Sequence, residues 1–164
     1  MFDRYSVLAR QAVFVARKKA GETGATSIDT EHLLIGILTV HPELPEQLSV
    51  EIDPTSIENQ SKQSQGSVAA IPDAVDLPIT PDLGKVLEHA ISIADEQQCR
   101  EIRTEHLVAS MLDEGGNAAK LLTDSQLEKK AMSDLISTID RSRPQQPTEA
   151  SCRALSLIIG GSSS

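Results

Sequence analysis

The sequence predicts an all-α fold built from two four-helix halves that are related by a pseudo-twofold axis. The segment Ile-x-Thr-Glu-His-Leu occurs twice, at 28–33 and 102–107, and the same offset of 74 residues aligns further small and apolar residues. Apolar residues recur at helical spacing in both copies, and the sequence shows no strand-like alternation. A repeat of this length in two copies is typical of a duplicated domain half rather than a solenoid unit.

The first helix of each half is predicted to begin after a hydroxyl cap. Ser6 and Thr80 correspond under the offset, and Thr80 is followed by a proline and then by Asp82. That order of N-cap, proline and first-turn acid is a typical helix start. In the first half we expect Gly21 and Gly24 to end the helix and to open a turn.

The second helices are predicted to start at Thr30 and Thr104. Pro42 and Pro45 are expected to end the first copy, and the glycine pair 115–116 is expected to end the second.

Each half then has a short third helix and a fourth helix. The third helices are expected to end near Leu48 and Leu122. The fourth helix is expected to open at Asp53-Pro54 in the first half and at Ser125 in the second.

These elements divide the chain of 164 residues into two repeats, at about 1–60 and about 79–140. A linker rich in Gln and Ser joins them over about 59–78. Residues 141–164 contain prolines, glycines and serines and are predicted to form a disordered tail.

The composition excludes several classes of function. A net charge of -9 argues against nucleic-acid binding, which needs a basic face. The sequence has no apolar run long enough to cross a membrane and does not open like a signal peptide. Cys99 and Cys152 have no partner motif and are expected to be free thiols in a reducing compartment. We therefore expect a cytoplasmic protein without membrane or nucleic-acid partners.

The repeated Glu-His pair does not have the spacing of a metal or catalytic site. Two ligands on one helix face are usually four residues apart, whereas these are adjacent. We instead expect Glu31 and Glu105 to offset backbone donors in the first helical turn, and His32 and His106 to pack and hydrogen-bond between helices. No phosphate loop or nucleophile motif accompanies them, so the sequence predicts no metal, no cofactor and no catalytic residue.

The capped helix starts are the candidate binding sites. A hydroxyl cap, free backbone N–H groups and Arg4 are suited to a phosphate or carboxylate. Ser6 is paired with Glu31 in the first half, and Thr80 is paired with Glu105 in the second. If cap and glutamate lie close, the pocket suits a ligand with an anionic end and a cationic stem. The alternative is an ordinary cap beside a solvated arginine.

Several segments in both halves resemble the Clp N-terminal repeat domain of the ClpC branch. In the first half they are Met-Phe-Asp-Arg-Tyr-Ser at 1–6 and Ile-x-Thr-Glu-His-Leu-Leu-x-Gly-x-Leu at 28–38. In the second half they are Ile-Thr-Pro at 79–81, Lys-Val-Leu-Glu at 85–88 and the second Thr-Glu-His-Leu. The resemblance covers residues 1 to about 140 and implies a helical pseudo-dimer that receives adaptors and substrates for an attached AAA+ unfoldase. The sequence contains no AAA+ modules, so a stand-alone domain is expected.

The resemblance also implies two phosphoarginine sites, with the cap hydroxyl near phosphate and the motif glutamate facing guanidinium. The matching residues are Ser6 with Glu31 and Thr80 with Glu105.

The chain departs from the family pattern close to these sites. The usual glycine before Thr-Glu-His is Asp29 in one copy and Arg103 in the other, and the glycine kept at Gly36 is replaced by Ser110. A carboxylate at Asp29 would repel phosphate and Arg103 would attract it, so the second site is predicted to be the better one. Arg4 and Arg103 are the expected anion contacts.

The sequence thus favours a non-catalytic protein-binding module that works with the Clp protease or chaperone. Its expected partners are Clp ATPase or protease subunits, adaptors or substrate proteins. Three alternatives stay open: an independent sensor of phosphoarginine-tagged or misfolded proteins, a degenerate ClpC remnant, and an enzyme that uses His32 or His106.

Overall fold

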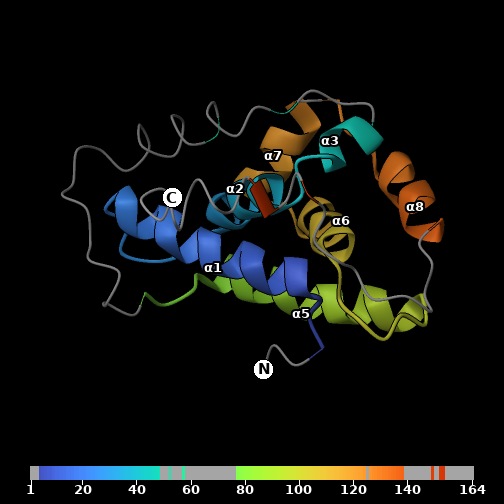
Figure 1. Ribbon diagram of the computed structural model, residues 1–164, viewed down its shortest axis with the longest axis horizontal. Helices are drawn as coiled ribbons and strands as arrows, with labels where there is room; N and C mark the ends of the chain where they lie inside the picture. Colours follow the sequence, from blue (N-terminus) through green and yellow to red (C-terminus); the bar gives the residue numbers. More distant parts are fainter. Residues whose placement is uncertain are drawn as a thin grey trace.

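The computed structural model describes residues 4–48, 77–124 and 126–138, together with the single positions 52, 57, 149, 152 and 153. Within these residues the chain is helical and forms no strand, as predicted (Figure 1). The helices are α1 (Val7–Glu22), α2 (Thr30–Val40), α3 (Leu44–Gln47), α5 (Pro81–Glu96), α6 (Thr104–Glu114), α7 (Asn117–Asp124) and α8 (Lys129–Ser137). The expected fourth helix of the first half, at Asp53-Pro54, lies outside the described residues, as does most of the predicted linker and tail.

The predicted starts of the four long helices are confirmed. Ser6 is the N-cap of α1 and Thr80 is the N-cap of α5. The second helix of each half begins at Thr30 or Thr104, with the preceding residue as its N-cap.

The prediction that Gly21 ends α1 is wrong. Gly21 is still helical, and the helix runs to Glu22 with Thr23 as its C-cap. The turn is made by Gly24, whose φ of 75° lies in the left-handed region that glycine adopts without strain.

The two glycines after α6 end that helix as predicted, with φ of 81° at Gly115 and 92° at Gly116. The third helix of the second half extends to Asp124, slightly beyond the expected end at Leu122.

The predicted start of the last helix at Ser125 is also wrong. Gln126 takes a φ of 66°, which turns the chain, and α8 begins only at Lys129 after the cap residue Glu128. The turn could not be foreseen from the sequence, because residue 126 is a glutamine, which rarely adopts this conformation, and not a glycine.

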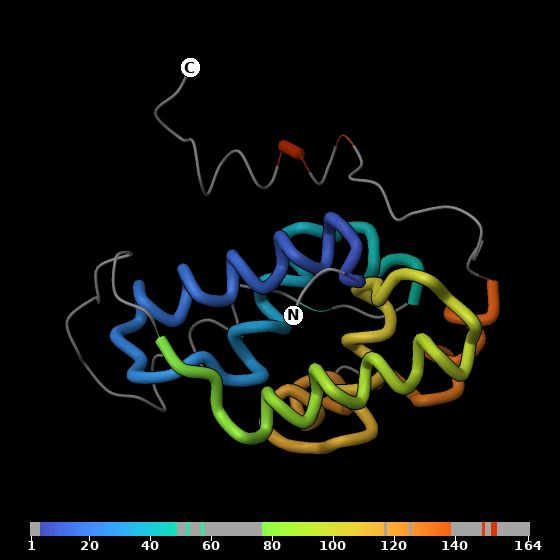
Figure 2. The backbone as a smooth tube through the Cα atoms, turned by 90° about the horizontal axis from the view of Figure 1, so that it is seen from below, coloured from blue at the N-terminus to red at the C-terminus, as the bar shows by residue number. Residues whose placement is uncertain are grey.

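The helices pack as two pairs. In the first half α1 packs on α2, and in the second half α5 packs on α6, which also carries α7 and α8. The outer helices α1 and α5 run in opposite chain directions along two edges of the molecule (Figure 2). This arrangement is the pseudo-twofold expected from the repeat.

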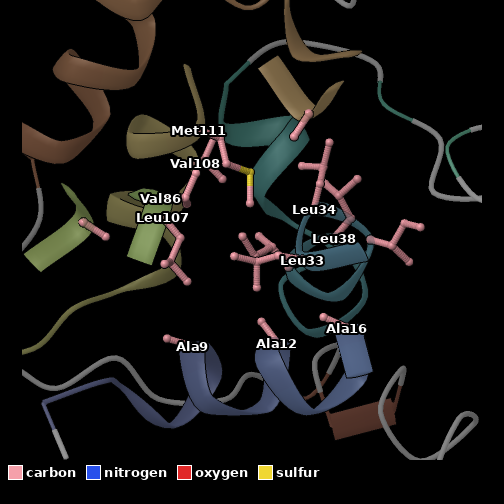
Figure 3. Close-up of a cluster of buried hydrophobic side chains, with 14 of the residues drawn as sticks. Ala9, Ala12, Ala16, Leu33, Leu34, Leu38, Val86, Leu107, Val108 and Met111 are labelled. Carbon is pink, nitrogen blue, oxygen red and sulfur yellow. The ribbon is translucent and has the colours of Figure 1, made fainter. Parts of the chain in front are cut away.

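One core cluster of buried apolar side chains runs through both halves. Three alanines of α1 face the leucines of α2, and side chains of α6 lie on the other side of those leucines (Figure 3). Small side chains on α1 let its backbone approach α2 closely. Helix α2 is buried on nearly every side, since Thr39 is its one residue that is not fully buried.

The backbones of α1 and α2 come into contact at Gly36. A Cβ atom on this residue would collide with the carbonyl oxygen of Ala12, so only glycine fits. At the equivalent place in the second half, the Ser110 hydroxyl donates a hydrogen bond to the carbonyl of Val86 at 2.6 Å. Val86 is the repeat equivalent of Ala12, so the second crossing accommodates a side chain that the first excludes.

None of the helices in the described stretches combines the length and the apolar character needed to traverse a bilayer.

Candidate functional site

The start of α1 lies beside the start of α6, which belongs to the other half. The backbone N–H of Ser6 donates to the carbonyl of Ile102 at 3.0 Å, and the N–H of Ile102 donates to the carbonyl of Arg4 at 2.9 Å. These bonds form an isolated parallel bridge between Tyr5 and Ile102.

The start of α5 lies beside the start of α2 in the same way. The N–H of Ile28 donates to the carbonyl of Pro78 at 2.8 Å, and the N–H of Thr80 donates to the carbonyl of Ile28 at 3.0 Å. The bridge between Ile28 and Ile79 is therefore the repeat equivalent of the one between Tyr5 and Ile102.

The backbone pairing is thus crossed between the halves. Thr80 lies next to the segment that leads into Glu31, and Ser6 lies next to the segment that leads into Glu105. The expectation that each cap is paired with the glutamate of its own half needs correction, because the bridges exchange the partners. Arg103 accordingly lies in the segment beside Ser6 and not in the one beside Thr80.

Both caps serve their helices. The Ser6 hydroxyl oxygen accepts from the N–H of Ala9 at 3.1 Å, and that of Thr80 accepts from the N–H of Leu83 at 3.2 Å. The Ser6 side chain is completely buried. Thr80 is only half-buried, and its hydroxyl also donates to Asp29.

The motif histidines close the starts of their own helices. His32 Nδ1 accepts from the N–H of Asp29 at 3.0 Å, and His106 Nδ1 accepts from the N–H of Arg103 at 2.9 Å. This is the role that glutamate or glutamine takes in a capping box. This capping role of the histidines was not expected from the sequence. The signal that could have shown it is a polar residue three positions after the N-cap.

Burial keeps both imidazoles neutral. Desolvation lowers the pKa of His106 to about 4 and also lowers that of His32, against the opposing pull of neighbouring carboxylates. Because Nδ1 accepts a bond, the single ring proton of each neutral imidazole is on Nε2.

The residues before the motif distinguish the two starts. The Asp29 carboxylate accepts from the N–H of Thr30 at 2.7 Å and from the Thr80 hydroxyl at 3.0 Å. Asp29 is therefore a good N-cap and brings a negative charge to the cap hydroxyl of Thr80. Arg103, at the equivalent place, has no acceptor to offer the helix.

The Arg103 side chain turns instead to Glu105. Its guanidinium lies 3.3 Å from one carboxylate oxygen, and the Thr104 hydroxyl donates to the other at 3.0 Å. Burial alone raises the pKa of Glu105, but Arg103 and the hydrogen bonds to the carboxylate outweigh it, so the net pKa lies below the usual value. The carboxylate that was expected to face a ligand's guanidinium thus faces one from its own chain.

A second contact at this start links the halves. His41 Nδ1 lies 2.9 Å from the Thr104 hydroxyl oxygen. The single proton of that hydroxyl is donated to Glu105, so the imidazole is the donor in the contact. His41 follows α2 and belongs to no repeated motif. Its contact with Thr104 arises only from the packing of the two halves.

Two buried donors at this start lack an acceptor. Within the described residues, Arg103 Nε and His106 Nε2 are buried and make no hydrogen bond. Unsatisfied buried donors are rare in folded proteins, and each needs a physical explanation.

Arg4 is held against the end of α5. Its guanidinium pairs with Asp95 at 2.7 Å and donates to the carbonyls of Cys99 and Arg100 at 3.4 Å each. It lies on the surface rather than in the buried cluster around Glu105.

In the stretches that the structure covers, no three His, Cys, Asp or Glu side chains are grouped so as to hold a metal ion.

The sequence of these two repeats matches a family profile. The profile described as the Clp repeat (R) N-terminal domain matches residues 4–151. The chain belongs to the Clp repeat N-terminal domain family.

Sequence relatives of this Clp N-terminal domain are subunits of Clp proteases and chaperones. It is 28% identical over 145 residues to the "ATP-dependent Clp protease ATP-binding subunit ClpA homolog" of Cyanidium caldarium, a match that covers 85% of this chain and 17% of the relative. It is 27% identical over 127 residues to "Chaperone protein ClpC1, chloroplastic" of Arabidopsis thaliana, which covers 74% and 13% respectively. The chain thus spans less than a fifth of the length of these relatives.

Solved Clp N-terminal domains share the fold. The N-terminal domain of ClpD from Arabidopsis thaliana superposes with a TM-score of 0.69 at 19% identity, covering 84% of this chain and 98% of that domain. The Hsp104 N-terminal domain from Candida albicans gives 0.68 at 14% identity, covering 91% and 99%. The predicted helical double repeat is confirmed by these likenesses.

Proposed function

We propose that this Clp N-terminal domain is a non-catalytic protein-binding module that acts as an accessory or adaptor-like factor of a Clp protease or chaperone system. The observation that supports the proposal is the family match over residues 4–151, since Clp N-terminal domains are protein-binding modules. The partners would be Clp ATPase or protease subunits, adaptors or substrate proteins, in the cytoplasm and without nucleic acid or membrane.

The test is capture of partners from the native cells by the tagged full chain, read by mass spectrometry. Recovery of Clp ATPase or peptidase subunits supports an accessory role. Recovery of damaged or tagged proteins without any Clp subunit supports the independent sensor, and recovery of neither supports a degenerate remnant.

A second candidate function is recognition of phosphoarginine at the paired helix starts. The specific observation in its favour is the pair of unsatisfied donors, Arg103 Nε and His106 Nε2. A phosphate oxygen is a strong acceptor that would satisfy such groups. Against it, Glu105 is already engaged by Arg103, and Asp29 lies at the Thr80 hydroxyl.

The glutamates and Arg103 can be tested separately by calorimetric titration with free phosphoarginine. Loss of binding in Glu31→Ala/Glu105→Ala, with the helical circular dichroism unchanged, would support the glutamates as ligand contacts. Because both glutamates are buried, the isosteric Glu105→Gln serves as a second variant if the double variant fails to fold. The Arg103→Gly variant decides the role of Arg103: weaker binding means that it contacts the anion, and tighter binding means that it blocks Glu105.

A further inference from the structure

A surface groove lies in the second half, away from the paired helix starts. It is lined by residues of α5, α6 and α8, whose places in the fold Figure 1 shows, and has a volume of about 260 Å³. Its lining includes Ile93 and Glu96 of α5, Ala109 and Asp113 of α6, and Lys129 and Ser133 of α8.

The lining of the groove includes apolar side chains that stay accessible. Ile93 and Ala109 pack against the core but stay partly exposed, and Met132, which also lines the groove, is buried. Two of the lining side chains, Ala109 on α6 and Ser133 on α8, are small. Neither side chain is large enough to fill the space beside it.

The rim of the groove is acidic. Glu96 on α5 and Asp113 on α6 are both in the lining, and the one lysine of the lining, Lys129, lies 3.4 Å from Asp113. His89 lies 3.0 Å from Asp113 and 3.7 Å from Glu114. Glu114 is therefore a further carboxylate close to Asp113.

The surrounding half of the molecule has the same sign. Residues 77–138 contain eleven acidic and six basic side chains, whereas residues 4–48 contain five of each. The negative charge of the described chain is thus concentrated in the half that carries the groove, and it favours a positively charged partner there.

We propose that this groove binds a short amphipathic helix of a partner protein, with lysine or arginine beside its apolar side chains. A volume of about 260 Å³ is below the range of about 300–1,000 Å³ found for small-molecule pockets, and it suits a few apolar side chains of a docked segment. The basic residues of the segment would meet Glu96 and Asp113. The inference rests on the proposed role as a protein-binding module and assigns that role a surface distinct from the helix starts.

The probe is a fluorescein-labelled peptide of leucine and lysine, about 14 residues long, with its leucines at helical spacing. Its binding to the full chain is followed by fluorescence anisotropy. The Ser133→Leu variant fills the hollow and is expected to weaken binding by about ten-fold or more, because the peptide leucines can no longer enter the groove. The Glu96→Gln/Asp113→Asn variant is expected to weaken it by about five-fold, and less at high salt.

Matched variants separate a local effect from general attraction to an acidic protein. Ser92→Leu adds the same side chain to the exposed face of α5 outside the groove lining. Glu46→Gln/Asp124→Asn removes the same charge from exposed positions on α3 and α7. Both controls are expected to bind within about two-fold of the wild type. A peptide in which glutamate replaces lysine is expected not to bind.

Equal weakening in the groove variants and in the matched controls overturns the proposal, as does equal binding of the acidic peptide. Tighter peptide binding after removal of residues 141–164 would show that the chain's own tail occupies the groove. Self-association that is abolished by Ser133→Leu in sedimentation experiments would assign the groove to a second copy of the chain. Either outcome overturns the proposal of a partner protein. If Clp subunits are still captured while the peptide does not bind, only the groove assignment fails. If the peptide binds and no Clp subunit is captured, the groove stands and the Clp association fails.

Discussion

The first half of the chain packs α2 on α1 through a glycine, whereas the second half packs α6 on α5 through a serine. At Gly36 the two backbones are so close that no side chain fits, and at Ser110 the hydroxyl bonds the carbonyl of Val86. The same helix crossing is therefore held once by backbone contact and once by a hydrogen bond. Duplication conserved the position of the crossing and left its chemistry free to diverge.

The paired helix starts differ in charge as well. A carboxylate, Asp29, caps α2 and binds the hydroxyl of Thr80, whereas Arg103 precedes α6 and turns to Glu105. A ligand would therefore meet a carboxylate at one start and an arginine–glutamate ion pair at the other. Two sites that are equivalent in backbone are not equivalent in what they can bind.

The largest effect is expected from Gly36→Ala. The new methyl group would collide with the Ala12 carbonyl, which is fixed within α1, so we expect a loss of about 3 kcal/mol of unfolding free energy. Urea denaturation measures it. The matched Ser110→Ala variant removes one hydrogen bond and should cost only about 1 kcal/mol. Equal costs would contradict the different closeness of the two crossings.

The next effect is the pH dependence carried by His106. Its pKa is about 4 in the folded chain and about 6.5 when unfolded, so below about pH 6.5 the unfolded state binds the proton first. Its contribution to stability is complete above pH 6.5 and is lost as the pH falls towards 4, by about 3 kcal/mol.

The His106→Gln variant isolates this term. Glutamine can accept the N–H of Arg103 as the imidazole does but does not titrate, so stability should vary less between pH 6.5 and 4 than in the wild type. Glu105, whose pKa is lowered, contributes stability that is complete above the ordinary carboxyl pKa of about 4.5 and is lost as the pH falls below it, so it overlaps only the acid end of this window. Identical profiles for His106→Gln and wild type in thermal melts across this window would refute the assignment.

A smaller effect is expected from Thr80→Ala. This change removes an N-cap and one of the bonds to Asp29 and should cost about 1 kcal/mol. A double-mutant cycle with Asp29→Ala should show coupling of about 0.5 kcal/mol or more, because the two side chains are in contact. Additive losses would mean that the contact contributes nothing.

The smallest effect is expected from Arg4→Ala. The ion pair with Asp95 is exposed, and its repeat equivalent does not exist because Pro78 occupies the matching position. We expect a loss of about 0.5 kcal/mol that disappears at high salt. A loss that is independent of salt would show that the carbonyl contacts of Arg4, and not its charge, stabilise the chain.

What the sequence predicted correctly depends on neighbouring residues. Ser6 and Thr80 were predicted as caps because a hydroxyl before a helix acts on donors three residues away. The repeat offset likewise predicted two equivalent helical halves. The sequence did not show which cap would lie beside which glutamate, because that depends on how the halves meet.

The parts that were missed depend on distant residues or on uncommon local conformations. His41 contacts Thr104 only because the two halves pack together. Arg103 was expected to contact an anionic ligand, but it pairs with Glu105. The late start of α8 follows from a left-handed glutamine, which residue preference does not predict. The groove of α5, α6 and α8 depends on which faces the helices turn to one another.

The crossed bridges have a consequence for how the chain is made. When a ribosome has completed the whole first repeat, the backbone partner of Tyr5 has not yet been synthesised, because it is Ile102. The N-terminal segment can form its bridge only after the segment before the second Thr-Glu-His motif has been synthesised. Closing so long a loop costs conformational entropy, whereas forming a local helix does not require such a closure. The two repeats, although copies of one half, therefore complete their folding as one unit.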